Sequence, residues 1–418
     1  MYRRVKTKAF GGLFLRCICV CSIAILPVVS KPAAAQITRG SDWIVAYNLP
    51  SRSSSSPAQG EKAIRDSLLQ KIGRLEKGHS AGLATYTLSG DSDSMGAAGP
   101  LLVAVSQALD RGAAVLFVVD NNVGRITRFG PADLSLNRLS RRGTNPMAVS
   151  IAPDDVLMHH KIGIFDFGRN AKWVFTSSWN FTGGASIFQW NIGVFLRNDT
   201  LHAAYAAEME EFRAGRFGSA KNRRHDGTRF RLEGAWGDCW VRFSPFHGSG
   251  GGSRDAETDI IRMINNARDD IYFALNKINR PGIQLALVNA VNRGVRVTGV
   301  IPESDLVEGR FAVSAPIKAH LSNPANFRGQ RNVVFLKARA QSGDDEADSG
   351  QRDLVHTKYM IIDPDGRNPV VIHGSANWTA AGLSSPTGND ENTLFLLHRD
   401  IAATFLEHFH RMTIPLDE

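Results

Sequence analysis

Two histidines in this chain are each followed by the same polar residues at the same distances, +2, +7, +19 and +21. The first series is His159, Lys161, Asp166, Ser178 and Asn180, and the second is His356, Lys358, Asp363, Ser375 and Asn377. A single His-x-Lys pair on a strand is ordinarily polar decoration. Agreement at five positions indicates internal duplication, and polar residues placed twice inside apolar strands cost stability unless they serve a function.

The residue types of the two series point to phosphate chemistry. Lysine and amide groups can hold non-bridging phosphate oxygens and stabilise developing charge. A neutral imidazole can attack phosphorus, while a protonated one opposite can protonate the leaving oxygen. An aspartate can orient the far ring nitrogen of a histidine. No His, Asp and Glu arrangement with metal-ligand spacing surrounds these residues, so no metal or other cofactor is expected. By residue type alone, His159 and His356 are interchangeable.

The elements that must position these residues are strands. Residues 156–165 and 354–362 read as strands, and the period of two places the histidine and lysine of each motif on one face. Asp166 and Asp363 fall at the ends of these strands, where ligands in α/β sheets usually collect. A second strand in each half, 172–176 and 370–373, leads into the Ser-x-Asn step.

The segments before the motifs repeat the same order of elements. Residues 61–76, 82–88, 99–111 and 113–119 read as helix, strand, helix and strand, and the order returns at 255–268, 270–275, 281–293 and 295–301. Strands alternating with crossover helices predict an α/β fold with a sheet covered on both faces. We therefore expect two α-β-α sandwich repeats, over residues 36–220 and 235–418, with a polar linker between them.

The first 35 residues have the pattern of a secretory signal peptide. A basic start is followed by an apolar run at 17–29 and a small-residue step that predicts cleavage before Gln36. The run is too short to span a bilayer. The expected location is secreted or periplasmic. The remaining chain has one cysteine, Cys239, and 43 Lys and Arg against 40 Asp and Glu, a net charge of +3. That small excess gives little global support for nucleic acid binding.

The duplicated motif resembles that of the phospholipase D superfamily. The second copy, VHTKYMIID followed by HGSANW and NDEN, is the closer match, and the first, MHHKIGIFD followed by TSSWN, is looser. The resemblance implies two lobes related by a pseudo-twofold axis, one active site between them, a phosphohistidine intermediate and no required metal. It also implies that His159 is the nucleophile, that His356 is the general acid and base, and that Glu391 supports the site.

The two halves differ near the expected site. Aligning Asn191 with Asn392 places Trp190 opposite Glu391, so the first half lacks that carboxylate; this is either drift or an apolar wall for the substrate. Ser177 stands where the second half has Gly374. The neighbouring side chains interpreted as structural are His160, His373 and Cys239. The arginine-containing segments 120–155 and 302–352 are expected to border the site, as phosphate-binding loops or as ordinary solvated surface.

These features favour a phosphodiesterase that releases the headgroup alcohol from a glycerophospholipid at a membrane surface, acting as a monomer. A nuclease of the same superfamily, acting on DNA or RNA, is the alternative. A cardiolipin-synthase-like transferase ranks third, and a non-catalytic binding protein is disfavoured because both motifs are intact.

Overall fold

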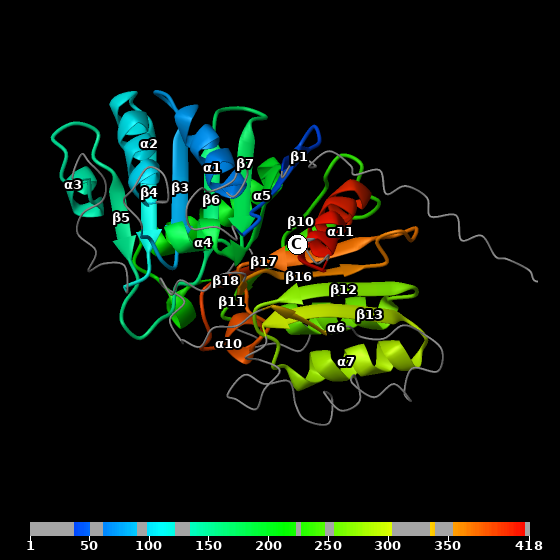
Figure 1. Cartoon of the computed structure of the whole chain (residues 1–418). Coiled ribbons are helices and arrows are strands. Elements are labelled where there is room, and N and C mark those ends of the chain that lie inside the picture. The colour runs from blue at the N-terminus through cyan, green and yellow to red at the C-terminus, as the bar shows by residue number, and fades with distance from the viewer. Residues whose placement is uncertain are drawn as a thin grey trace, which may run out of the picture. The chain divides into compact units, whose positions relative to one another are not determined.

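Each repeat contains two parallel strands joined by a helix. In the first repeat β3 (Ser80–Thr85) and β4 (Ala114–Val119) pair in parallel, and α2 (Ala98–Asp110) connects them. In the second, α7 (Pro281–Asn292) connects β12 (Asp270–Leu275) to β13 (Arg296–Pro302) in the same way. Parallel strands require such a crossover. The predicted order of elements is confirmed, with bounds that move by a few residues (Figure 1).

The computed structural model describes residues 37–50, 62–89, 98–121, 134–222, 227–246, 255–302, 335–338 and 354–413. The remaining strands of the first repeat are β1 (Ile37–Arg39), β2 (Trp43–Tyr47), β5 (Ala148–Ile151), β6 (Lys161–Asp166), β7 (Lys172–Ser177), β8 (Gln189–Trp190) and β9 (Ile192–Arg197). Its helices are α1 (Ala63–Gly73), α3 (Leu136–Ser140), α4 (Gly183–Ile187), α5 (Asp199–Arg213) and the 3-10 turn η1 (Gly218–Ala220). The second repeat adds β10 (Arg229–Phe230), β11 (Cys239–Ser244), α6 (Ala256–Asn266), β14 (Phe335–Ala338), β15 (Leu354–Val355), β16 (Lys358–Ile362), β17 (Val370–Gly374), α10 (Ala380–Leu383), β18 (Glu391–Leu396) and α11 (Arg399–Thr413).

The two large sheets have the same strand order. The first runs β1-β2-β9-β7-β6-β3-β4-β5 and the second runs β10-β11-β18-β17-β16-β12-β13-β14. In both, the strand that carries the motif lysine, β6 or β16, is antiparallel to the central parallel pair. Position-by-position agreement of two eight-stranded orders is the structural counterpart of the duplicated motif, and the α/β prediction is confirmed.

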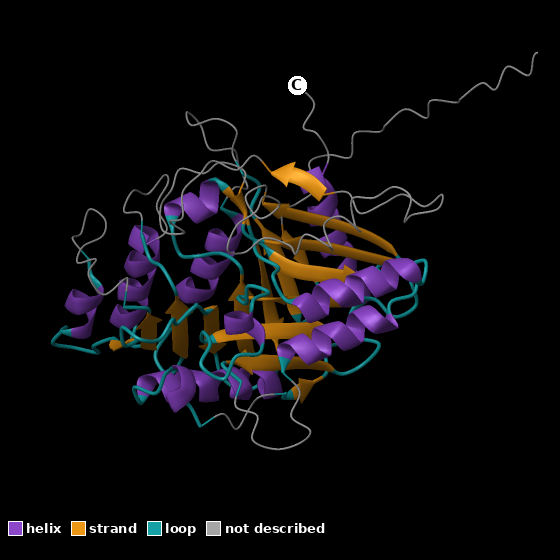
Figure 2. Ribbon diagram, turned by 90° about the horizontal axis from the view of Figure 1, so that it is seen from below, coloured by secondary structure: helices purple, strands orange, loops and turns teal. Residues whose placement is uncertain are grey.

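Alternating side chains place helices on both faces of the first sheet. Phe175 and Phe195 pack in the cluster formed with α1 and α2. Their neighbours Val174 and Val194 belong to the cluster that includes α5 and the core of the second repeat. This alternation is the period of two expected for a sheet buried on both sides. Figure 2 shows helices on either side of the strands, which gives the α-β-α layers that the sequence predicts.

The motif strands are shorter than predicted because the residues before them leave the sheet. β6 begins at Lys161, and Met158 instead forms a bridge with Asp390 of the other repeat. In the second repeat the predicted strand is divided, and β15 pairs with β8 of the first repeat. Each histidine therefore lies on a segment that crosses to the opposite repeat.

Both repeats belong to one compact unit, residues 35–418. The predicted signal peptide, residues 1–35, lies outside the described residues, as do 122–133, 303–334 and 339–352 of the two arginine-containing segments. Within the first of these segments, Arg142 is described, and it pairs with Asp110 of α2. None of the helices in the described ranges is both long and apolar enough to cross a bilayer.

Candidate active site

The two motif histidines come together where the repeats meet, and each is fixed by the opposite repeat. The backbone N–H of His159 donates to the carbonyl of Asp390 at 3.0 Å, and that of His356 donates to the carbonyl of Trp190 at 3.1 Å. The contacts are reciprocal, as a pseudo-twofold axis requires. Both histidines are 1% exposed.

Each imidazole also meets a side chain of the opposite repeat through Nδ1. His159 Nδ1 lies 2.6 Å from Glu391 Oε1, and His356 Nδ1 lies 3.1 Å from Asn191 Oδ1. Asn191 is oriented by its own bonds, because its Nδ2 donates to the carbonyl of Ala185 and its Oδ1 accepts from Ser178. An acceptor at Nδ1 selects the tautomer that carries its proton there, which leaves the lone pair on Nε2.

The strand register corrects the predicted alignment of the two repeats. Ser177 and Gly374 are equivalent because each lies 18 residues after its motif histidine (177 − 159 and 374 − 356), and they pair with Gly193 and Thr393. Counting back two residues from that pair makes Asn191 the counterpart of Glu391. Trp190 therefore does not stand opposite Glu391, and the alignment that suggested an apolar substrate wall is wrong.

Trp190 is the counterpart of Asp390. Its ring is buried and packs against the ring of His408, with 5.8 Å between the ring centres. The difference between Ser177 in the first repeat and Gly374 in the second has a steric cause. A Cβ on Gly374 would come within 2.1 Å of the Asn392 carbonyl oxygen, so the second repeat requires glycine there. In the first repeat the glycine of the pair is Gly193 instead.

The motif lysines lie beside the histidines of their own motifs. Lys161 Nζ donates to the His159 carbonyl and Lys358 Nζ to the His356 carbonyl, both at 2.8 Å. Their side chains are almost completely buried. The sequence did not single out Tyr86, whose ring lies 4.9 Å from that of His159 and 5.4 Å from Lys161 Nζ. Its position directly after a parallel strand was the available signal.

The Ser-x-Asn steps contribute two different functions. Ser178 and Ser375 brace the site, since each is bonded to the strand that carries the histidine partner: Ser178 Oγ accepts from Ile192 N, and Ser375 Oγ accepts from Asn392 N, both at 3.1 Å. The asparagines are different. Asn180 is buried, and neither amide atom has a partner among the described residues; the same holds for Asn377 Oδ1. Buried amides without partners are suited to bind a ligand.

The structure does not bring Asp166 and Asp363 to the histidines. Asp166 accepts from Gly168 N and pairs with Lys172 at 3.3 Å. Burial opposes its ionisation, but the Gly168 N–H and Lys172 hold the pKa of Asp166 below its usual value. Asp363 accepts backbone N–H groups from 268–270, which ties the end of β16 to the start of β12.

The catalytic role expected for both aspartates is thus corrected to a structural one. β6 is antiparallel to β3, so its beginning lies at the catalytic edge and its end at the other edge. Five residues of strand correspond to about 16 Å. The task of orienting the imidazoles belongs to Glu391 and Asn191.

A buried charge network that the sequence did not reveal supports Glu391. Lys221, in the linker between the repeats, pairs with Glu208 and, at 2.7 Å, with Asp390. His160 Nε2 lies 3.2 Å from Glu208. Burial raises the pKa of Glu208, but Lys221 and His160 outweigh the effect of burial and hold this pKa at about 2. Asp390 precedes Glu391 and accepts the His159 N–H, so the network anchors the segment that carries the carboxylate.

The other polar residues interpreted as structural are buried in the core. Burial lowers the pKa of His373 to about 3 and raises that of Cys239 to about 11, so both are neutral near pH 7. In the described parts of the chain, no three His, Cys, Asp or Glu side chains gather as candidate metal ligands. The candidate site therefore offers two oriented imidazoles, the two lysines bonded beside them, and two buried amides from the Ser-x-Asn steps.

Comparison with known families shows to which family the chain belongs. The family described as cardiolipin synthase, phospholipase D-like domain, matches residues 75–213 and 260–413, one segment for each repeat. These segments make up more than half of the chain, which belongs to this family. The chain has no significant match among curated proteins.

Two solved structures share the fold over most of this chain. Phosphatidylserine synthase from Haemophilus influenzae Rd KW20 is similar with a TM-score of 0.56 and 12% identity, over 84% of each chain. Polyphosphate kinase from Porphyromonas gingivalis has a TM-score of 0.52 and 12% identity over 85% of this chain, which spans only 49% of that enzyme. Nuc from Salmonella typhimurium, a phospholipase D family member, is 25% identical over 42% of this chain and 93% of its own, with a TM-score of 0.28.

Proposed function

We propose that this protein is a phosphodiesterase that hydrolyses the headgroup phosphodiester of glycerophospholipids through a phosphohistidine on His159. The observation that carries the proposal is the crossed pair of imidazoles, one on a carboxylate and one on an amide. A lipid substrate is supported by two names that mention phospholipids, that of the cardiolipin synthase family and that of phosphatidylserine synthase.

The first step transfers the phosphatidyl group to the enzyme. His159 Nε2 attacks phosphorus, a P–N bond forms, and the bond from phosphorus to the headgroup oxygen breaks. His356 gives its Nε2 proton to that oxygen, so the headgroup leaves as a neutral alcohol. Lys161, Lys358 and Asn180 hold the non-bridging oxygens, whose charge grows in the transition state.

The second step returns the enzyme to its starting state. A water molecule attacks phosphorus and gives a proton to His356, which now acts as the base. The P–N bond breaks, phosphatidate leaves, and His159 recovers its lone pair. An alcohol in place of water would give a new phosphodiester by the same route, so hydrolysis and transfer differ only in the second acceptor.

The test offers the purified protein phosphatidylcholine vesicles and plasmid DNA side by side, with a chelator present. We expect choline release without nicking of the plasmid. Nicking without choline release would replace the lipid proposal with the nuclease alternative. Glycerol added as an acceptor measures transfer against hydrolysis, and a His159→Ala variant serves as the control for contaminating activity.

A further inference from the structure

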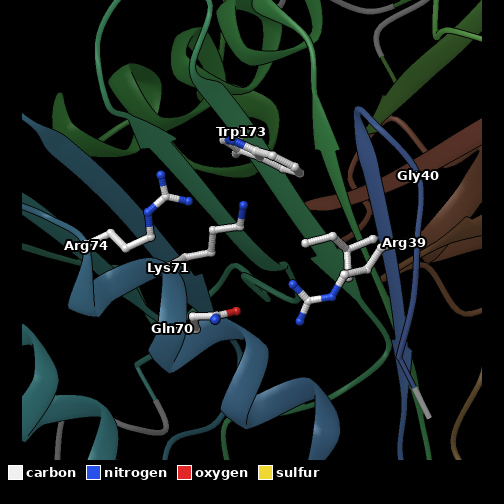
Figure 3. Close-up of a pocket in the computed structure, with 7 residues that line it drawn as sticks. Arg39, Gly40, Gln70, Lys71, Arg74 and Trp173 are labelled. Atoms are coloured by element: carbon white, nitrogen blue, oxygen red, sulfur yellow. The ribbon is translucent and has the colours of Figure 1, made fainter. Parts of the chain in front are cut away.

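A second cluster of cations lies on the first repeat, at the end of the sheet away from the histidines. Arg39 at the end of β1, Lys71 of α1, Arg74 directly after α1, and Trp173 of β7 surround a pocket of about 230 Å³ (Figure 3). Trp173 lies four residues before Ser177, the end of β7 at the catalytic edge, so about 13 Å of strand separates the two places.

Lys71 is the central residue of this pocket and has no anionic partner among the described residues. Its side chain is 4% exposed, and its ammonium lies 3.0 Å from the centre of the Trp173 ring. In the described part of the chain, no carboxylate pairs with Lys71, Arg39, Arg74 or the nearby Arg197. Burial and then the charges of Arg74, Arg39 and Arg197 lower the pKa of Lys71 to about 7. Several cations thus repel one another around a buried amine.

The second repeat shows that the fold does not need these charges. Trp173 and Val370 are equivalent, because each lies 14 residues after its motif histidine (173 − 159 and 370 − 356). Aligning α1 and α6 from their first residues makes Ile264 the counterpart of Lys71. Val370 and Ile264 are both buried and apolar. The same layers pack with two aliphatic side chains, so a lysine facing a tryptophan is a feature of the first repeat alone.

We propose that this pocket binds a phosphate group, as inorganic phosphate or as a phosphomonoester, in addition to the catalytic site. Figure 3 shows the guanidinium groups of Arg39 and Arg74 on either side of Lys71, with the Trp173 ring above it. Two guanidinium forks suit the oxygens of a dianion, and the lysine adds a point charge. A bound dianion would supply the negative charge that the described residues lack there.

The first experiment measures binding of inorganic phosphate by titration calorimetry to the full mature chain. Arg39→Gln/Arg74→Gln removes two charges from the pocket. Arg213→Gln/Arg231→Gln is the matched control, because it removes two exposed arginines that are paired with carboxylates elsewhere. Any binding at the catalytic site contributes equally to both variants. We expect the pocket variant to lose one class of sites, weakened at least about tenfold, as two charged hydrogen-bonding groups are removed. Equal binding by pocket variant and control would overturn the proposal.

The second experiment counts protons, and sulfate is the probe because it does not titrate near neutral pH. At pH 8 the Lys71 amine in the empty pocket is mostly neutral, given its lowered pKa. An anion beside it favours the protonated form, so binding should take up close to one proton. Calorimetry in two buffers of different ionisation enthalpy measures this uptake. Lys71→Met, which keeps the volume, should abolish it. Sulfate binding by the wild type without proton uptake would contradict the role of Lys71.

Vesicle sedimentation then separates the two sources of the phosphate group. Phosphatidylcholine vesicles with and without phosphatidate are offered to wild type and Arg39→Gln/Arg74→Gln. Binding that depends on both phosphatidate and the arginines assigns the pocket to a lipid headgroup. Arginine-dependent binding of inorganic phosphate alone assigns it to a soluble phosphate. If neither probe distinguishes the pocket variant from the control variant, the site does not exist.

Discussion

The two halves of the active site use one scaffold with different charges. At equivalent positions Glu391 meets His159 and Asn191 meets His356. One residue earlier, the second repeat has Asp390, bound to the buried Lys221, whereas the first has the apolar Trp190. The backbone bonds to the histidines are the same in both halves. The duplicated fold thus determines where the imidazoles lie, and the substituted side chains determine what each can do.

A carboxylate and an amide have different consequences for the ring that they hold. Both accept the Nδ1 proton and fix the ring, but only the carboxylate stabilises positive charge on it. A histidine that gains a phosphoryl group at Nε2 becomes cationic, so we infer that His159 is the nucleophile. His356 must give up and recover a proton within one turnover, and a neutral partner does not trap that proton. The carboxylate of Glu391 thus gives a physical reason for the assignment of His159 as the nucleophile, which the family resemblance implied.

The largest effects should separate the two histidines. Replacing either by alanine should lower phosphatidylcholine hydrolysis by about 10⁴-fold or more, because one removes the nucleophile and the other the acid. A substrate with a p-nitrophenol headgroup needs no protonation of its leaving group. With it, His356→Ala should still release a burst of nitrophenolate equal to the enzyme concentration, and His159→Ala should not. A burst from His159→Ala alone would reverse the assignment.

Glu391→Gln tests the half that carries the carboxylate. The amide can present its NH₂ group to Nδ1 and select the wrong tautomer, so kcat/KM should fall by roughly 10²–10⁴-fold. Asp166→Asn is the matched control, since it makes the same type of change in a motif carboxylate at the other end of the strand. Its activity should stay within a few-fold of wild type. Equal losses in both variants would show that Asp166 acts on the site after all.

The contrast between Glu391 and Asp166 also shows what the sequence could predict. The histidines, lysines and Ser-x-Asn steps were predictable because duplication preserves their spacing, and the helix and strand order followed from hydrophobic periodicity. The role of Asp166 was not predictable. The rule that ligands collect at the ends of strands holds for parallel strands, and β6 is antiparallel to β3.

Asn191, the partner of His356, was aligned with the wrong residue of the second repeat for a different reason. Eleven residues separate it from Asn180, whereas fourteen separate Glu391 from Asn377 (191 − 180 and 391 − 377). Counting from the motif therefore fails, and similarity of residue type favours pairing Asn191 with Asn392. Only the hydrogen-bond register between the strands gives the equivalence. The buried Lys221 network and the cationic pocket likewise depend on contacts between distant segments.

Lys221→Met tests the charges that hold the second half in place. Removing the cation leaves Glu208 and Asp390 buried without it, which should cost about 3–5 kcal/mol of unfolding free energy. The pKa of Glu208 in the folded protein, about 2, lies below its ordinary value of 4.5. The stability from Glu208 is therefore present above pH 4.5 and lost as the pH falls toward 2. Urea unfolding at pH 7 and pH 3 measures both effects. A Lys221→Met variant as stable as wild type at pH 7 would mean that the network contributes nothing.

The smallest effect should come from making the two halves alike. Asn191→Asp places a carboxylate at His356, where it stabilises the protonated ring and hinders its action as a base in the second step. Turnover should fall about tenfold at neutral pH, and the rise of kcat with pH should move up by roughly one pH unit or more, because a nearby opposite charge favours the charged form. The phosphoenzyme should accumulate, since its formation uses the protonated ring and its hydrolysis does not. Asn198→Asp, which makes the same substitution at the N-cap of α5, controls for the added charge. If Asn191→Asp leaves the pH profile and the phosphoenzyme level unchanged, the neutral amide of Asn191 has no effect on the protonation of His356. The division of labour would then have to come from the substrate rather than from the partners of the two histidines.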